Sequence, residues 1–164
     1  MATAEEDGQK NKYLTFLLAD EYYGMEISYV TEIIGIQKIT EVPRMPPYIK
    51  GVINLRGQVI PVMDVRLRFD LPERAYNDRT CIIVVSTGLI VVGLAVDEVS
   101  EVLVIPDERI EKVNRADQGV ASRCIRGMAK LESGVKILLD LKELVFAGEE
   151  DRLGGQLVQE ALEE

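Results

Sequence analysis

The side chains that perform most enzymatic chemistry are missing or dispersed in this sequence. Its 164 residues contain no histidine, which excludes Ser-His-Asp and Cys-His nucleophilic sites, imidazole-based zinc sites and phosphohistidine chemistry. The phosphate-binding patterns G-x-x-x-x-G-K-[S/T] and G-x-G-x-x-G are also absent from it. We therefore expect no cofactor, no metal and no nucleotide chemistry.

Carboxylates are the chemically active groups that remain in quantity. Asp and Glu number 28 against 19 Lys and Arg, for a net charge of -9. A carboxylate pair can perform general acid-base catalysis, so a small all-β hydrolase is an alternative function; it would need two close acids of shifted pKa in a deep polar cleft. Many acids cluster near the two ends, where solvated charge is the ordinary explanation: Glu5, Glu6, Asp7, Glu149, Glu150, Glu163 and Glu164.

The net charge, the two cysteines and the N-terminal residues indicate which partners and which cellular compartment to expect. Basic residues are scattered along an acidic chain that repels phosphate, so nucleic acid is not an expected partner. Cys81 and Cys124 lie far apart without C-x-x-C spacing, and we interpret both as buried thiols. The first residues contain no basic segment followed by an apolar one, and no apolar run approaches about 18 residues. We expect a cytoplasmic protein without direct membrane insertion.

These side chains must be positioned by a mostly β fold, because valine and isoleucine are abundant and pack well on pleated strands. Alternating apolar residues predict a hairpin formed by residues 13–20 and 22–27. Ser28 is expected to cap a single helical turn through residues 29–30. The prolines of residues 43–47 then predict an extended, irregular loop.

Two further hairpins are predicted by apolar runs on either side of short turns. At the first turn, Gly57 can adopt a positive φ at little steric cost. Pro61 has no N–H for a ladder, which predicts a sheet edge or a bulge at that point. The hairpins pair residues 51–55 with 58–64 and residues 125–131 with 135–139.

Short helices and connections complete the predicted order of elements. Asp64 is expected to cap a helix over residues 65–69, and Asp140 a helix through residues 141–145. Between the hairpins, residues 72–78 are interpreted as a polar linker. Three successive strands, a meander, are predicted at 80–87, 89–96 and 98–105, followed by a charged, turn-rich segment to 122.

The domain organisation follows from this order. Residues 1–12 form a polar N-terminal arm, residues 13–147 one domain of roughly ten short strands, and residues 148–164 an acidic tail. Apolar residues recur at helical spacing in the tail, which favours a short amphipathic helix. Gly154 and Gly155 interrupt it, so a frayed tail is the alternative.

Ordered motifs along most of the chain give a more specific indication. They are Y-G-M-E-I at 23–27, V-T-E-I at 30–33, I-K-G-V-I-N-L-R-G at 49–57, V-I-P-V-M-D-V-R at 59–66, Y-N-D at 76–78, V-G-L-A-V-D-E-V-S-E-V at 92–102, I-R-G-M at 125–128 and I-L-L-D at 137–140. In this order they resemble the CheW family of chemotaxis coupling proteins, over about residues 12 to 147.

The resemblance implies a fold and a function. The fold would be two SH3-like five-stranded β-barrels sharing a hydrophobic core, with short helices. The function would be that of a non-catalytic adaptor that links the cytoplasmic tips of methyl-accepting chemoreceptors to the regulatory domain of the histidine kinase CheA. The chain would be cytoplasmic and recruited to membrane receptor arrays, although another chemosensory pathway could use the same module. With 164 residues it is too short to be the kinase itself.

The resemblance also marks apolar and small residues as candidate partner-binding positions. Val30, Ile33 and Ile39 match family positions near a groove that takes the helical receptor tip, and ordinary core packing is the alternative for each. Gly51 and Gly57 match positions sensitive to change, although turn geometry alone can explain both. Val102 and Cys81 match positions near the kinase or receptor faces, with core packing favoured for Cys81.

The resemblance marks Arg56 as the strongest candidate. An arginine at a hairpin tip gains little from folding, whereas its planar fork of N–H donors can clamp a carboxylate at an interface. Glu32 matches a family acid that lies near this arginine, so we expect a Glu32–Arg56 pair that orients the guanidinium. Two solvated charges are the alternative.

Overall fold

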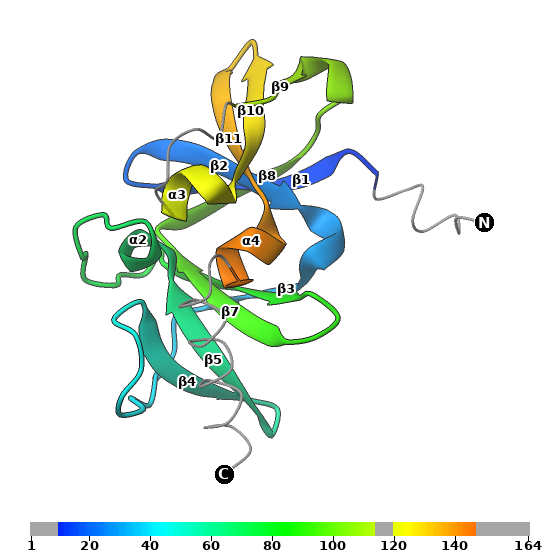
Figure 1. Ribbon diagram of the computed structural model, residues 1–164. Helices are drawn as coiled ribbons and strands as arrows, with labels where there is room; N and C mark the ends of the chain where they lie inside the picture. The colour runs from blue at the N-terminus through cyan, green and yellow to red at the C-terminus, as the bar shows by residue number, and fades with distance from the viewer. Residues whose placement is uncertain (1–9, 114–119, 147–164) are drawn as a thin grey trace.

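The computed structural model describes residues 10–113 and 120–146, which form eleven β-strands and a few short helices (Figure 1). The strands make two mixed sheets, one of six strands and one of five. The expected mostly β fold is confirmed. The N-terminal arm up to residue 9 and the acidic tail lie outside the described residues. No helix in the described ranges has the length and apolar character required to cross a membrane.

The middle of the chain forms the five-stranded sheet, in the order β3-β6-β7-β5-β4. The hairpins β4–β5 and β6–β7 are antiparallel, and β5 and β7 join them as a parallel pair. The predicted hairpin around the Arg-Gly turn is therefore confirmed. The strands are β3 (Val30–Gly35), β4 (Ile49–Leu55), β5 (Gln58–Asp64), β6 (Cys81–Ser86) and β7 (Val91–Val96).

The two ends of the described chain together form the six-stranded sheet, in the order β8-β1-β2-β11-β10-β9. Both predicted hairpins, β1–β2 and β10–β11, are present, and a parallel pair between β2 and β11 joins them. Figure 1 shows the blue first hairpin beside the orange last one. The strands are β1 (Lys12–Leu18), β2 (Glu21–Glu26), β8 (Glu98–Val104), β9 (Ile110–Glu111), β10 (Ile125–Leu131) and β11 (Gly134–Leu139).

Both predicted aspartate caps are confirmed. The side chain of Asp64 accepts a hydrogen bond from the Leu67 N–H at 3.2 Å at the start of α2 (Val65–Arg68). Asp140 likewise accepts from the Glu143 N–H at 3.2 Å at the start of α4 (Leu141–Phe146). Each cap satisfies an amide of the first helical turn that has no partner within the helix.

The helical turn predicted at Ser28 is placed differently. A 3₁₀ turn, η1 (Ile27–Tyr29), has Glu26 rather than Ser28 at its N-cap, with no capping side chain. Val30 does not belong to the turn but begins β3, a strand that the sequence analysis did not predict. The β-branched residues of β3 pair with the buried strand β6, so sheet pairing determines the conformation here.

The prediction that Pro61 marks an edge or a bulge is wrong. Pro61 is buried in β5, which lies inside the sheet between β7 and β4. Its partner Val52 exchanges both of its backbone hydrogen bonds with Thr40, each at 2.8 Å, on the other side of β4. At this pair the ladder therefore needs no N–H from Pro61.

The predicted meander is also wrong in its third strand. β6 and β7 form a hairpin, but β8 pairs with β1 in the other sheet. The chain crosses between sheets at Asp97, whose N–H donates to the Leu17 carbonyl at 3.2 Å. β7 is buried along most of its length whereas β8 is largely exposed, as suits an edge strand.

The charged segment after β8 contains more structure than predicted. Within it lie the 3₁₀ turn η2 (Asp107–Arg109), the two-residue strand β9 and the start of α3 (Val120–Cys124). The predicted polar linker is likewise ordered, because the Tyr76 hydroxyl donates to Asp64 Oδ2 at 2.7 Å. Burial and this hydrogen bond both raise the pKa of Tyr76.

Apolar side chains gather in three clusters. The central cluster takes residues from both sheets, including Leu14 and Phe16 of β1 with Ile83 and Leu94 of the other sheet. Each remaining cluster belongs mainly to one sheet, around Ile53 in the five-stranded sheet and around Tyr13, Ile105, Ala129 and Leu138 in the other. The expected shared core is therefore present, together with a smaller core for each sheet.

Each sheet has two edge strands in the described part of the chain, so the prediction of two barrels is supported only as two curved mixed sheets. The bridge between Thr40 and Val52 brings the segment after β3 against the opposite edge, β4. In the other sheet, the segment after β8 returns in the same way as β9, which pairs with β10.

The two cysteines differ. Cys124 is fully buried, as expected, and Cys81 is half-buried, which corrects the prediction that both are buried. The Cys81 thiol donates to the Arg79 carbonyl at 3.4 Å. The two cysteines form no disulfide with each other.

Candidate functional site

Arg56 and Glu32 form a two-point ion pair at the surface. Arg56 Nη1 donates to Glu32 Oε2 at 3.1 Å, and Nη2 pairs with Oε1. Arg56 stands at the tip of β4–β5 with φ +53°, followed by Gly57 with φ +85°. The turn is held by Asn54, whose Oδ1 accepts from the Gly57 N–H at 2.9 Å. The expected pair is thus present in the structure.

The pair connects two edges of one sheet. Glu32 lies on the edge strand β3, whereas Arg56 ends the hairpin that contains the other edge strand, β4. An ion pair between them requires the sheet to curve until its edges approach each other. The pair therefore fixes the direction of the guanidinium relative to β3.

Arg56 is the more exposed member of this ion pair. The side chain of Arg56 is 72% exposed and that of Glu32 is 27% exposed. The hydrogen bonds from Arg56 hold the pKa of the Glu32 carboxyl below its usual range, and Glu32 raises the pKa of Arg56. Both groups remain charged at neutral pH, and the arginine presents its outer face to solvent, where a carboxylate of a partner can reach it.

Exposed apolar side chains lie beside this pair in the chain. Ile33 of β3 is 42% exposed and Val59 of β5 is 47% exposed. Ile33 pairs with Ile83, a member of the central cluster, so it lies on that side of the β3 edge. We call Glu32, Ile33, Arg56 and Val59 the Arg56 surface. Along these strands an oriented charge lies next in sequence to exposed apolar side chains, the two kinds of group that protein-binding surfaces combine.

The other predicted apolar residues divide between packing and exposure. Val30 is half-buried and packs against the central cluster, and Ile39 packs against the cluster around Ile53. Val102 is 50% exposed on β8, an edge of the six-stranded sheet. The structure therefore brings Glu32 and Arg56 together beside Gly57. It directs the neighbouring Ile33 to the other face of β3, on the side of the central cluster, and places Val102 on a different sheet.

Gly51 has a sufficient structural explanation. Its φ is +145°, and a Cβ added there would lie 2.1 Å from the Thr40 carbonyl oxygen and 3.0 Å from Ile39 Cγ2. Only glycine allows Thr40 to bridge to β4 so closely. At Gly57 nothing lies within 4 Å of an added Cβ, and the positive φ alone favours glycine.

Sequence reasoning missed Val59 and a second two-point ion pair. Arg66 of α2 donates through Nε and Nη2 to the two carboxylate oxygens of Asp97, each at 2.7 Å. Asp97 also accepts from the Ala19 N–H at 3.0 Å. Burial acts to raise the pKa of Asp97, but the hydrogen bonds from Arg66 and Ala19 prevail and hold it below its usual value. This pair joins α2 to the point where the chain crosses between sheets; its residues are far apart in sequence, and no local pattern announces their contact.

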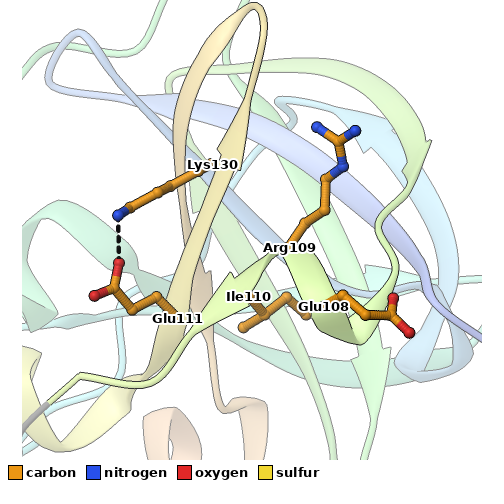
Figure 2. A pocket seen from close by; sticks show the side chains of 5 residues that line it. All are labelled: Glu108, Arg109, Ile110, Glu111 and Lys130. Carbon is orange, nitrogen blue, oxygen red and sulfur yellow. Dashed lines mark ion pairs between the residues drawn. The ribbon is translucent and has the colours of Figure 1, made fainter.

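A hollow of about 490 Å³ lies beside β9, and carboxylates form part of its lining, as the hydrolase alternative requires. Figure 2 shows its carboxylates, Glu108 and Glu111, pointing away from one another. Glu111 Oε2 lies 2.6 Å from Lys130 Nζ, and this partner lowers the pKa of Glu111. A general acid needs a raised pKa and a nearby second carboxylate, so this hollow does not support the hydrolase. Within residues 10–113 and 120–146, no group of three or more Cys, Asp or Glu is placed to hold a metal ion.

Comparisons with known proteins agree on one family. The family profile described as "CheW-like domain" matches residues 12–148. The chain is 36% identical over 138 residues to the "Chemotaxis protein CheW" of Klebsiella aerogenes, covering 84% of this chain and 83% of that protein. It is 36% identical over 129 residues to the protein of that name from Bacillus subtilis, covering 79% and 83%. A solved structure, the "scaffolding protein TtCheW from Thermoanaerobacter tengcongensis", superposes with a TM-score of 0.76 at 35% identity, covering 85% of this chain and 94% of that one.

Proposed function

The chain belongs to the CheW family of chemotaxis proteins, and from this membership we propose that it is a non-catalytic adaptor that couples chemoreceptors to the histidine kinase CheA. Its partners are the cytoplasmic tips of methyl-accepting chemoreceptors and the regulatory domain of CheA. It acts in the cytoplasm, recruited to receptor arrays at the membrane. In this reading the two curved sheets correspond to the two SH3-like barrels expected of the family.

The observation that carries the proposal is the oriented, exposed guanidinium of Arg56. A non-glycine residue at positive φ costs backbone energy, and glycine would avoid this cost at a hairpin tip. Folding gains little in return from an ion pair at the surface. We therefore assign Arg56 a role in binding. Because Glu32 already holds the guanidinium in place, little conformational entropy is lost when it contacts an acidic group of a partner.

The apolar part of the site supports a helix-in-groove contact with a receptor tip. Val30 and Ile33 lie on the central-cluster side of β3, where they can flank a helix that packs between the sheets. Ile39 and Gly51 lie at the opposite edge, β4, where Thr40 bridges to Val52. Gly57 permits the turn that presents Arg56, and Val102 belongs to a second contact on β8.

The test is co-sedimentation of the chain and CheA with receptor-bearing membranes, combined with receptor-stimulated kinase activity. Arg56→Glu should lose co-sedimentation and kinase stimulation. Arg44→Glu is the matched control, because Arg44 is also an exposed arginine at positive φ, +64°. Full activity of Arg56→Glu, or an equal loss in Arg44→Glu, would remove Arg56 from the binding surface.

A further inference from the structure

The chain consists of two consecutive repeats of one order of elements. Each repeat begins with a hairpin, continues with an edge strand and a second hairpin, and ends in a short helix that an aspartate caps. The first repeat, residues 12–68, contains β1 to β5 and α2. The second repeat, residues 81–146, contains β6 to β11 with α3 and α4, and residues 69–80 connect the two.

Glycines at corresponding places support this division. I-K-G at 49–51 recurs as I-R-G at 125–127, and in both hairpins the register shifts immediately before the glycine. In each sheet one fully buried apolar residue lies between this glycine and a second glycine on the next strand. The two triplets are Gly51–Val62–Gly93 in the five-stranded sheet and Gly127–Leu138–Gly24 in the six-stranded one.

The two repeats exchange their first hairpins. The hairpin β6–β7 of the second repeat lies between β3 and β5 of the first, and β1–β2 of the first repeat lies between β8 and β11 of the second (Figure 1). The directions agree as well, because each exchanged hairpin is antiparallel to the edge strand and parallel to the second hairpin. Each repeat therefore supplies the centre of a sheet whose other strands belong to the other repeat.

Polar contacts between the repeats meet at Asp97. This residue belongs to the second repeat, whereas its partners belong to the first. Its carboxylate accepts from Arg66 Nε and Nη2 at 2.7 Å each and from the Ala19 N–H at 3.0 Å, and its own N–H donates to the Leu17 carbonyl at 3.2 Å. The side chains of Arg66 and Asp97 are 12% and 14% exposed. Reversing either charge therefore disturbs the association of the two repeats.

We propose that a second copy of this chain is a partner of the fold and binds by exchange of repeats, so that the first repeat of each copy pairs with the second repeat of the other. This dimer contains the same sheets, the same central cluster and the same Asp97 contacts as the single chain. Exchange of identical elements is a low-cost route to a dimer, because almost every contact that is broken forms again.

Exchange requires the connection between the repeats to open at one turn. Asn77 Oδ1 accepts from the Arg79 N–H at 2.8 Å and from the Thr80 N–H at 3.2 Å, and this turn leads the chain into β6 of the same copy. The connection before the turn is held on the first repeat, where the Tyr76 hydroxyl donates to Asp64. Opening the turn breaks few hydrogen bonds. Pairing within one chain prevails in dilute solution, and a second copy competes as the protein concentration rises.

Exchange leaves the Arg56 surface intact in each copy, since its residues all belong to the first repeat. The dimer presents this surface twice and can therefore hold two partners at once. This consequence rests on the proposed adaptor function, whereas the exchange itself does not.

The test reverses the charges of Arg66 and Asp97 in different copies. Arg66→Asp and Asp97→Arg each place like charges together within a single chain, and each should lower the melting temperature by about 10 °C. Equal amounts of the two variants are unfolded in urea and refolded together at high protein concentration. Exchange then places unaltered Arg66 against unaltered Asp97, and the two introduced charges against each other. Analytical ultracentrifugation should find a heterodimer with one copy of each variant, which melts above either variant alone.

The Glu32–Arg56 pair is the matched control, because both residues belong to the first repeat and exchange cannot restore their pairing. Glu32→Lys and Arg56→Glu refolded together should form no more dimer than the unaltered protein. The same result is expected when Arg66→Asp and Asp97→Arg are combined in one chain, since the pair is then complementary within that chain.

Two results would overturn the exchange of repeats. The first is a mixture of Arg66→Asp and Asp97→Arg that forms no more dimer than the unaltered protein or than the control mixture. The second is an equally abundant dimer of either variant by itself, which indicates contact between two complete copies. If neither variant folds alone, the mixture still decides, because exchange restores the ion pair only when both variants are present.

Discussion

The β4–β5 and β10–β11 hairpins are two versions of one structure, and they differ most where the chain is least constrained by packing. Both have a glycine after the register shift, a buried centre and an aspartate cap. Their tips carry Arg56-Gly57 in one case and Glu132-Ser133 in the other. Buried positions therefore specify the framework, while the binding character of each half depends on a few exposed residues.

Substituting the glycines of the two hairpins should have the largest effect on the free energy of unfolding. Gly51→Ala should destabilise the fold by about 3 kcal/mol, because its Cβ would meet a backbone oxygen 2.1 Å away at a φ that disfavours alanine. At Gly127 the nearest atoms are Ile110 Cγ2 at 2.8 Å and the Glu111 oxygen at 2.9 Å, and φ is ordinary. Gly127→Ala should cost about half as much. Urea unfolding measures both.

Gly35→Ala is the control, since nothing lies within 4 Å of an added Cβ there and φ is ordinary. It should be neutral or slightly stabilising. If Gly51→Ala folds normally yet loses partner binding, Gly51 contacts a partner directly and its structural explanation is insufficient.

The tips should separate binding from folding. Arg56→Glu should weaken receptor or kinase binding by roughly ten-fold or more, because it sets like charges against each other at an interface. Its melting temperature should change by less than about 2 °C, since the side chain is mostly exposed. Receptor-stimulated kinase activity and thermal unfolding are measured on the same samples.

Glu32→Lys should also impair binding, and the double variant Glu32→Lys with Arg56→Glu should recover part of the loss. Recovery shows that the two residues act as a pair. Activity that falls only in proportion to folding would mean that the pair stabilises the sheet rather than the complex.

The two two-point ion pairs should differ in their response to acid. The folded-state pKa of Asp97 lies below its usual value, so its pairing stabilises the protein at neutral pH and is lost as the pH falls below about 4. Asp97→Asn should lower the melting temperature by about 5 °C at pH 7, because Arg66 loses its mostly buried partner.

The difference between Asp97→Asn and the unaltered protein should shrink as the pH is lowered through the folded pKa of Asp97. Thermal unfolding between neutral pH and pH 3 checks this. A difference that stays constant across the range would show that the carboxylate charge is not the stabilising feature.

The smallest effect is expected at the chain end. Deleting residues 148–164 should leave folding and kinase coupling nearly unchanged, because the family match ends at residue 148 and the tail is largely acidic. A fall in melting temperature of more than about 8 °C would mean that the tail packs on a sheet.

Local features were predictable from the sequence because they depend on neighbours in the chain. The three hairpins follow from alternating apolar residues and turn residues, and the caps at Asp64 and Asp140 from a side chain that reaches amides three residues away. The family resemblance and the position of Arg56 at such a turn both predict it as the leading site residue. The recurrence of I-K-G at 49–51 as I-R-G at 125–127 is likewise readable in the sequence.

Other features required the tertiary structure. No local sequence feature shows that β8 pairs with β1 and not with β7, because an antiparallel pair is possible with either strand. The choice depends on which apolar cluster would otherwise stay exposed. The same holds for Pro61, whose pair with Val52 needs no hydrogen bond from it and which precedes the first pair between β5 and β7. It also holds for Arg66 and Asp97, which meet across the sheet boundary.

The sequence by itself determined the mostly β class, the hairpins, the family and the arginine at the first tip, all of which are encoded in residue type and short spacing. Tertiary contacts determine which edges meet, so that Glu32 reaches Arg56 and β8 pairs with β1. Long-range pairing minimises the exposure of several strands at once, and that collective choice cannot be read from any one segment.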